Sequence, residues 1–582
     1  FLTRRINFNK STMKYFPLGI AGHVDHGKTS LVKALTSIDT DRLPEEKRRS
    51  MSIDIGFAFL DFPEESLRVE IIDIPGHERF IKNAICGLAP VWGLMLVVDA
   101  GEGVMPQTVE HLRIAKSFGI KKVLLVLTKI DRVDQSTVEL ASEEASDLIK
   151  KEGLDLFGVY GVSSITGEGM EGLRLGIKEY AKENIRDREN WLFRFYIDSA
   201  FSVKGYGTVV RGSCVFGKVE EGDLLTLEPL GLFCRVKRLQ NHGRFVKEGK
   251  AGERLALNIP ELEPDKVERG YFLVKGIKSS KRLIVRLEGQ RPKGVGYAFF
   301  GMREVSFSSQ HILEDYYLLK LSEPVPCIRW DKGPILDSSG RLMGHYEVLH
   351  PIPTRASKRF LRENLGLLKE DPLQYLLLER GLMGLSLSDL FSFYGHAINP
   401  PNLPRLKDTL YHPKSLEELA KRVKDILSTK EGIVSLPELL SRLGVSEDVL
   451  KLALSGLKDV KVVEGYLLDA KRARLEDLKG YRELMGLLSQ GIREERELEA
   501  YKEYLSMAVR KGQVYSLGDY LYISKKLFES YVERLKAIGK EFSIGEAKEV
   551  LGLTRKYLIP LLEHMDRLGI TRREGERRVF LR

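Results

Sequence analysis

The chain has 582 residues, of which 43% are hydrophobic and 30% charged, a composition typical of globular domains, and its length predicts about four of them. The net charge of +10 favours an anionic partner such as nucleic acid, and no apolar run approaches the ~20 residues of a membrane span. Four separated cysteines without a C-x-x-C pair argue against a zinc site, and the first residues lack the apolar core of a signal peptide, so we expect a cytoplasmic protein without membrane contact.

The first predicted elements are a strand over YFPLGIA and a helix over KTSLVKALTSI, joined by a phosphate-binding loop. The loop matches G-x-x-x-x-G-K-[ST], in which backbone N–H groups surround a β-phosphate, the lysine reaches the β and γ oxygens and the threonine hydroxyl binds Mg²⁺. The following helix directs its positive end at the phosphate. The residues expected to contact the nucleotide here are Gly22, Asp25, His26, Gly27, Lys28, Thr29 and Ser30.

The second motif lies in VEIIDIPGHERF, residues 69–80, where a buried strand runs into a turn. Asp73 is expected to hold a Mg²⁺-bound water, and the N–H of Gly76 can meet a γ-phosphate because glycine tolerates close approach. His77 is the candidate catalytic residue, since it can position the water that attacks the γ-phosphate. The alternative is an ordinary strand-end turn of the D-x-P-G type.

Two later motifs select the base. In VLLVLTKIDRVD, residues 123–134, the Asp131 carboxylate can accept from both N1–H and the exocyclic amine of guanine, a donor pair that adenine lacks. The Lys129 stem can lie over the purine. In GVSSITGEG, Ser163 and Ser164 follow the next strand, with the Ser164 N–H near guanine O6. The chain is therefore expected to bind GTP and GDP.

The strings GHVDHGKT, DIPGH, TKID and SSITG together resemble the translational GTPases of the elongation factor Tu group. Relatives usually have Asn at the position of Thr128, which leaves one hydrogen bond to the base open. Residues 45–62 resemble the first switch of that group. Where the group reads R-G-x-T, this chain has Arg49-Ser50-Met51-Ser52, and Ser52 keeps a hydroxyl for Mg²⁺ beside Thr29 and Asp73.

Short alternating strands and glycine turns then predict two antiparallel β-barrels, and beyond HPIPTRASK the pattern becomes helical. Helix pairs followed by two-stranded tails recur, most clearly at 460–470, 512–524 and 569–582, which is the outline of winged helices in an array. The predicted fold is an α/β P-loop GTPase domain (13–188), two β-barrels (189–275 and 276–353) and tandem winged helices (354–582), the last over about 526–582.

A GTPase of this group followed by tandem winged helices resembles the selenocysteine-specific elongation factors of bacteria. The resemblance implies GTP-dependent delivery of selenocysteyl-tRNA to the ribosome at recoded UGA codons, by a monomer that also binds an mRNA hairpin. The implied hairpin residues are Arg555, Lys556, Arg572, Arg573, Arg577 and Arg578. A solvated basic tail is the alternative for these residues.

The strings KGYGTVVRG and AGERLALN resemble the second domain of elongation factor Tu, which holds the aminoacyl end of a tRNA. The implied aminoacyl pocket contains Phe57, Asp198, Ser199, Phe201, Arg211 and Arg254. The two arginines would favour a selenolate anion over the neutral serine, unless they point outward to a glutamate or to the tRNA backbone. Two other functions stay open: a carrier of general or initiator tRNA, and a GTP-gated RNA-binding regulator without tRNA cargo.

Overall fold

The computed structural model describes residues 13–40, 52–290, 295–430, 432–463, 465–469 and 475–581. These residues fall into two compact units. The first extends to Arg380 and includes Leu385–Asn402 and Asp408–Leu410, and the second includes Gly381–Gly384, Leu403–Lys407 and the chain from Tyr411. Arg49, Ser50 and Met51 of the expected switch lie outside the described residues. None of the helices in the described ranges is both long and apolar enough to cross a bilayer.

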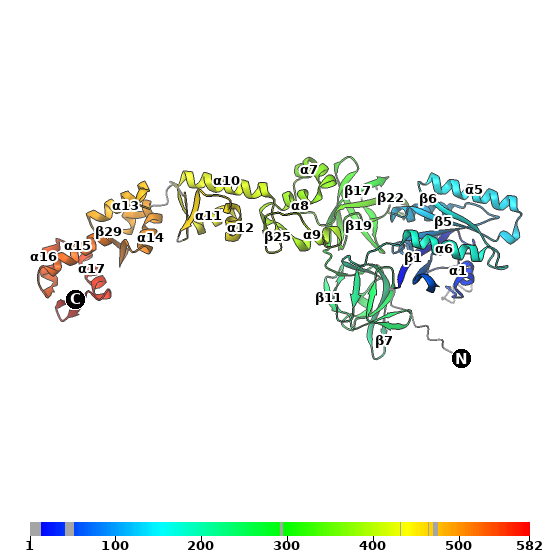
Figure 1. The fold of residues 1–582 in the computed structure, drawn as a ribbon, viewed down its shortest axis with the longest axis horizontal. Coiled ribbons are helices and arrows are strands. Elements are labelled where there is room, and N and C mark those ends of the chain that lie inside the picture. The colour runs from blue at the N-terminus through cyan, green and yellow to red at the C-terminus, as the bar shows by residue number, and fades with distance from the viewer. Residues whose placement is uncertain are drawn as a thin grey trace. The chain divides into compact units, whose positions relative to one another are not determined.

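The first domain is built on a mainly parallel sheet with helices against it, of which α5 and α6 are visible beside β5 and β6 in Figure 1. Within the described residues the sheet has six strands in the order β2-β3-β1-β4-β5-β6, and only β2 is antiparallel to its neighbour. The strands are β1 (Lys14–Gly22), β2 (Gly56–Phe62), β3 (Leu67–Asp73), β4 (Gly93–Asp99), β5 (Lys122–Thr128) and β6 (Asp155–Gly161). The helices are α1 (Lys28–Thr36), α3 (Ile81–Leu88), α4 (Pro106–Ser117), α5 (Gln135–Lys151) and α6 (Met170–Asn184).

This topology places the polar motifs together. Covered strands of a parallel sheet are apolar throughout, and every residue of β4 (GLMLVVD) is buried. The sequence motifs follow the carboxyl ends of β1, β3, β5 and β6, which lie at one edge of the sheet. In open α/β sheets that edge is where ligands bind.

The second domain is antiparallel. Over residues 193–275 the described strands form a sheet of eight, ordered β11-β10-β16-β7-β8-β15-β12-β13, beside a ribbon of β9 and β14. The hydrogen bonds therefore do not close this domain into a ring. The strands are β7 (Phe193–Val203), β8 (Gly207–Phe216), β9 (Lys218–Glu220), β10 (Leu224–Glu228), β11 (Leu232–Arg235), β12 (Arg238–Asn241), β13 (Arg244–Val246), β14 (Glu248–Lys250), β15 (Arg254–Asn258) and β16 (Phe272–Lys275).

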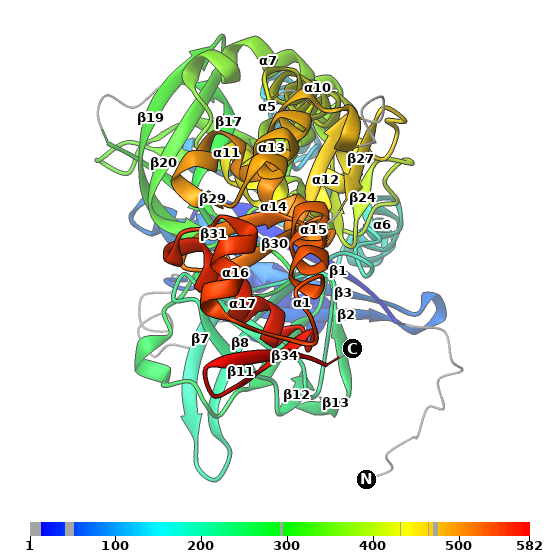
Figure 2. The ribbon, with the colours of Figure 1, turned by 90° about the vertical axis from the view of Figure 1, so that its left-hand side faces the viewer.

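The third domain does close. Over the described part of residues 280–350, the barrel order is β17-β20-β19-β18-β21-β22, and Figure 2 shows β17, β19 and β20 side by side. The strands are β17 (Ser280–Gly289), β18 (Gly296–Phe300), β19 (Arg303–Leu313), β20 (Tyr316–Val325), β21 (Lys332–Leu336) and β22 (Leu342–His350).

A helical segment packs directly on this barrel. It contains α7 (Lys358–Glu370), α8 (Pro372–Arg380), α9 (Leu387–Tyr394) and the paired short strands β23 (Leu385–Ser386) and β25 (Thr409–Leu410). Nε2 of His350 lies 3.0 Å from Oε2 of Glu379, and both side chains are fully buried. The Arg329 guanidinium donates to the carbonyl of Leu368 at 3.0 Å. The first helical module is therefore part of the first unit.

The second unit contains three helical modules, each with a described three-stranded sheet. Its helices are α10 (Pro413–Thr429), α11 (Leu436–Leu443), α12 (Glu447–Leu454), α13 (Lys479–Gln490), α14 (Lys502–Arg510), α15 (Lys525–Lys536), α16 (Ile544–Leu551) and α17 (Arg555–Arg567). Its strands are β24 (Arg405–Leu406), β26 (Ile433–Ser435), β27 (Val460–Val463), β28 (Tyr466–Asp469), β29 (Arg493–Glu494), β30 (Val514–Gly518), β31 (Leu521–Ser524), β32 (Glu541–Ser543), β33 (Thr571–Glu574) and β34 (Arg577–Phe580).

The last module shows how sequence sets its elements. The Ser543 hydroxyl caps α16 by accepting from the N–H of Glu546, and the Glu546 carboxylate accepts from the N–H of Ser543. Gly552 ends the helix in the left-handed region at φ 69°, which glycine adopts without strain. Helix α17 then follows, and β33 and β34 form the wing.

Candidate functional site

The phosphate loop joins β1 to α1 and carries its lysine inward. Gly27 has φ 82° and Asp25 has φ 62°, so the loop turns through the left-handed region twice. Nζ of Lys28 donates to the carbonyls of Gly22 at 3.1 Å and His23 at 2.6 Å. Burial lowers the pKa of Lys28 to about 8, although Asp73 and Asp25 oppose this shift. The loop therefore combines the buried Lys28 cation with a tight backbone turn, which is the arrangement that binds phosphate.

Oxygen ligands for a divalent cation gather beside this lysine. Oγ1 of Thr29 donates to Oδ2 of Asp73 at 2.9 Å and lies 3.1 Å from Oγ of Ser52. Thr40, which no motif identified, donates to the same Asp73 oxygen at 2.7 Å. Hydroxyl and carboxylate oxygens are the ligands that Mg²⁺ prefers, so the residues present fit that ion.

The turn after β3 lies against the phosphate loop. A methyl group at Gly76 would be 2.6 Å from Nζ of Lys28 and 2.8 Å from the N of Val24, so only glycine fits there without displacing its neighbours. His77 follows, half-buried, and its Nδ1 accepts from the N–H of Arg79 at 3.2 Å. This bond orients the imidazole at the edge of the site.

The base-side residues lie at the same edge, with one unexpected contact. Asp131 is exposed just after β5, and the hydroxyl of Ser163 accepts from the N–H groups of Ile165 and Thr166, which shapes the loop that includes Ser164. Thr128 is buried, and its hydroxyl donates to the carbonyl of His26 at 2.7 Å. Thr128 therefore links the base side to the phosphate loop.

Residues distant in sequence hold the loop in place. Nδ1 of His26 accepts from the N–H of Asp99, and Nδ1 of His111 accepts from the N–H of Gly22, each at 3.2 Å. Burial lowers the pKa of His26 to about 4 and that of His111 to about 3, so both rings are neutral acceptors at pH 7. Asp99 also pairs with Lys129 at 2.6 Å. Asp99 and His111 belong to no local motif, which is why sequence reasoning missed them.

A cavity of about 550 Å³ opens in the second domain. Three of its lining residues were predicted, namely Phe201, Arg211 and Arg254, and the remaining lining residues include Arg238, Gln240 and His242, which were not. The Arg211 guanidinium lies 4.3 Å from the centre of the Phe201 ring. The cavity is therefore lined by both arginine and aromatic side chains.

The other predicted pocket residues surround Arg254. Its Nη2 lies 2.7 Å from Oδ2 of Asp198, and its guanidinium carbon lies 3.6 Å from the centre of the Phe57 ring. Ser199 donates to Oδ1 of Asp198 at 2.8 Å. Asp198 thus offsets part of the Arg254 charge, which the sequence did not predict. Phe57 comes from β2, so the GTP-binding domain contributes to this group.

The basic residues of the last module differ in exposure. Arg555, Arg572, Arg573 and Arg577 are exposed, but Arg572 pairs with Glu574, and Arg577 lies 3.2 Å from Glu546. Lys556 pairs with Glu494. Arg578 departs from the prediction, because it is 5% exposed and its Nε donates to Asp566 at 2.9 Å. That guanidinium holds β34 to α17 instead of facing solvent.

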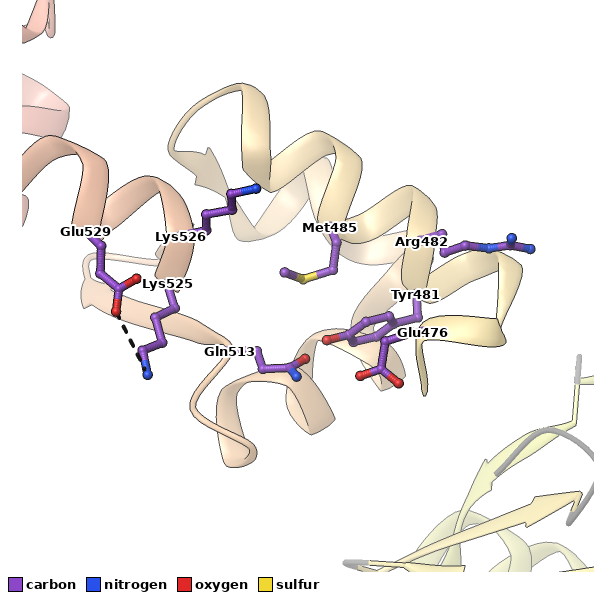
Figure 3. Close-up of a pocket in the computed structure, with 8 residues that line it drawn as sticks. All are labelled: Glu476, Tyr481, Arg482, Met485, Gln513, Lys525, Lys526 and Glu529. Carbon is purple, nitrogen blue, oxygen red and sulfur yellow. Dashed lines mark ion pairs between the residues drawn. The ribbon is translucent and has the colours of Figure 1, made fainter. Parts of the chain in front are cut away.

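A groove with a volume of about 480 Å³ lies between α13 and α15 of the second unit (Figure 3). Lys525, Lys526 and Arg482 supply positive charge, and Glu476 and Glu529 offset it. Lys525 lies 4.0 Å from Glu529, the ion pair drawn in Figure 3. This mixed charge makes the groove a weaker phosphate site than the exposed wing.

Two protein families match parts of the chain. The family described as Elongation factor Tu GTP binding domain matches residues 13–183, and the family Elongation factor SelB, winged helix, matches residues 533–580. Among curated relatives, the selenocysteine-specific elongation factor of Desulfomicrobium baculatum is 44% identical over 256 residues, and that of Escherichia coli strain K12 is 37% identical over 279 residues. These stretches cover 44% and 47% of this chain but only 40% and 45% of the relatives, so the matched part spans less than half of either.

A solved structure matches far more of the chain. The crystal structure of bacterial selenocysteine-specific elongation factor EF-Sec is 45% identical, with a TM-score of 0.78, and the match covers 98% of this chain and 100% of that one. Translation elongation factor SelB of Methanococcus maripaludis, solved with the GTP analogue GPPNHP, is 26% identical over 59% of this chain and 81% of its own, with a TM-score of 0.51. The predicted multidomain fold class is confirmed by these matches.

Proposed function

This chain belongs to the selenocysteine-specific elongation factors, with a GTP-binding domain of the elongation factor Tu type, and we propose that it delivers selenocysteyl-tRNA to the ribosome at recoded UGA codons. The observation that carries the proposal is the arginine-lined cavity in the same unit as the phosphate loop. Such delivery takes place in the cytoplasm.

The cavity suits an anionic aminoacyl group. A selenol is more acidic than a thiol, so the selenocysteine side chain is largely a selenolate at neutral pH, whereas serine is neutral. Arg211, Arg238 and Arg254 line the cavity. Charge-assisted hydrogen bonds are worth about 1.5–3 kcal/mol each, or one to two decades of discrimination. Asp198 offsets part of the Arg254 charge, and we assign the discrimination to Arg211 and Arg254 together.

The nucleotide site supports a timed release of this cargo. Thr29, Ser52 and Asp73 would hold Mg²⁺, which neutralises charge on the β- and γ-phosphates when it is bound. Lys28 would reach the γ-phosphate, and His77 would position the attacking water. Hydrolysis to GDP and phosphate, stimulated by the ribosome, would then end the hold on the tRNA.

The last module supports message recognition. Arg555 and Arg573 are exposed at the start of α17 and in the wing, and within the described part of the chain Nε of Arg573 donates to the carbonyl of Gly575. Arginine suits phosphates and unpaired bases, and RNA loops are read where bases are exposed. We therefore assign hairpin binding to the α17–wing face.

Binding of two cargoes tests the central proposal. Arg211→Ala in the full chain should weaken selenocysteyl-tRNA binding about 10- to 100-fold and leave the weaker seryl-tRNA binding nearly unchanged. Arg254→Ala should weaken the same binding selectively, although Asp198 already offsets part of the Arg254 charge. Lys247→Ala, at an exposed cation of the same domain outside the cavity, is the matched control.

Equal losses for both cargoes would mean that the arginines serve the tRNA backbone, which favours a general tRNA carrier. Absence of GTP-dependent binding to any aminoacyl-tRNA by the unmodified chain would favour a regulator without cargo. Filter binding in the presence of a non-hydrolysable GTP analogue measures both affinities.

A further inference from the structure

One residue of the cavity wall also contacts the GTP-binding domain. His242 lies in the turn between β12 and β13 with φ 44°, and its side chain is 23% exposed. It lines the cavity, and its Nε2 lies 2.9 Å from each carboxylate oxygen of Glu70. A non-glycine residue in the left-handed region is strained, so the turn presents this imidazole at a cost in backbone energy.

Residues of the GTP-binding domain surround the contact between His242 and Glu70. Glu70 is 4% exposed on β3, three residues before Asp73. The His242 ring packs on Phe59 of β2, with centroids 4.5 Å apart. On β3, the guanidinium carbon of Arg68 lies 4.3 Å from the centre of the Phe59 ring on β2. The same guanidinium donates to Oδ1 of Asn241 at 3.4 Å. The β2–β3 hairpin therefore contacts Asn241, the last residue of β12, and His242, the first residue of the turn.

The same hairpin reaches the other wall of the cavity. Phe57 of β2 lies under Arg254 at the start of β15. Its neighbour Glu253 accepts from Nδ2 of Asn241 at 2.6 Å, which ties the β15 end to the β12 end. Strands β12 and β15, which carry the cavity residues Arg238 and Arg254, thus contact a hairpin whose second strand ends at Asp73, the Mg²⁺ ligand candidate.

We propose that His242 is a positioning residue, whose contact with Glu70 couples the wall of the aminoacyl cavity to the state of the nucleotide site. This inference rests on the proposed function, because it assigns the cavity to the aminoacyl end. Strand β3 is buried except at Arg68, so a change at Asp73 on nucleotide exchange would be passed along the strand to Glu70 and from there to the β12–β13 turn. Coupling between two sites is reciprocal, so cargo binding would also favour the GTP state.

The test distinguishes loss of the His242–Glu70 contact from disruption of the β12–β13 turn. His242→Asn keeps a residue that tolerates positive φ but is too short to reach Glu70, and Glu70→Gln removes the charge from the other side. Glu65→Gln, which breaks only the surface pair with Lys182 near the same hairpin, is the matched control. Selenocysteyl-tRNA affinity is measured with a non-hydrolysable GTP analogue and with GDP, using the full chain.

The expected result is a fall of about tenfold in the GTP-to-GDP affinity ratio for His242→Asn and for Glu70→Gln, with no change for the control. The double variant should be no worse than either single one, because both remove the same contact. A loss equal in the two nucleotide states, or no loss, would overturn the coupling role and leave the proposed function intact. Failure of the unmodified chain to bind selenocysteyl-tRNA would instead overturn the proposed function and this inference with it.

Discussion

His26 and His111 act as neutral hydrogen-bond acceptors behind the phosphate loop. The geometry of the loop therefore depends on pH, because only the neutral rings can accept these bonds. His111 is 3% exposed and its ring accepts from the N–H of Gly22. A protonated ring would have no acceptor atom for that N–H and would place a second positive charge near Lys28. The loop geometry therefore depends on a residue of α4 that lies 89 positions away.

Replacing His111 should flatten the pH dependence of stability. Its folded pKa of about 3 lies below the ordinary 6.5, so its stabilising contribution is complete above pH 6.5 and is lost as pH falls toward 3. Between pH 7 and pH 5 the loss from this residue is about 2 kcal/mol, at 1.36 kcal/mol per unit. His111→Gln keeps an acceptor and cannot titrate, so urea unfolding should show about 2 kcal/mol less loss over that range. The exposed His311→Gln should behave like the unmodified chain, and an unchanged slope for His111→Gln would contradict the assignment.

At the residue scale, the sequence predicted the functional residues that lie within local motifs. It did not predict contacts between residues that are distant in the sequence and meet only in the folded chain. The phosphate-loop residues are consecutive, so their chemistry can be read from spacing. Thr40 and Asp73 are 33 positions apart, and Asp198 and Arg254 are 56 apart, so neither pair is visible before the strands are in register. Arg578 was misjudged because alternation along a two-stranded wing does not reveal which face meets α17.

At the scale of elements, the hairpins of the winged modules were predictable and their first strands were not. The predicted tails at 460–470, 512–524 and 569–582 contain the paired strands β27–β28, β30–β31 and β33–β34. Strands β26, β29 and β32 have two or three residues each, too few for any period to register. The open sheet of the second domain was likewise not predicted, since the sequence pattern does not show which edge strands pair.

The wing should bind the hairpin through its exposed arginine. Arg573→Ala in the full chain should lower hairpin affinity and reduce the slope of log affinity against log salt by about one, as for one lost phosphate contact. Lys526→Ala removes a cation of the groove in Figure 3 from the same module and should leave the slope unchanged. Arg578→Ala should instead lower the stability of the module, because it leaves Asp566 without its buried partner. Equal effects of Arg573→Ala and Lys526→Ala would indicate diffuse attraction to a basic surface.

At the scale of the whole molecule, the sequence placed a domain boundary at 353, but the contacts continue beyond it. The Pro-containing stretch at 350–358 and the change to a helical pattern both suggested a junction. The His350–Glu379 pair and the Arg329 bond to Leu368 instead join the barrel to the first helical module. The sequence pattern marks where the chain changes from strands to helices. It does not show whether the barrel and the helical module pack together.

Two truncations distinguish these boundaries. A chain that ends after Leu410 keeps the first unit's buried contacts, so it should bind GTP and selenocysteyl-tRNA like the full chain and lose hairpin binding. A chain that ends after Pro353 removes Glu379 from His350 together with Tyr375 and Phe393, whose rings pack on that imidazole, and it also removes two carbonyl acceptors of Arg329 on α7. The barrel surface that these helices cover would become exposed to water, so the shorter chain should unfold at clearly lower urea concentration. Equal stability of the two truncated chains would return the boundary to 353 and make the first helical module an independent part of the arm.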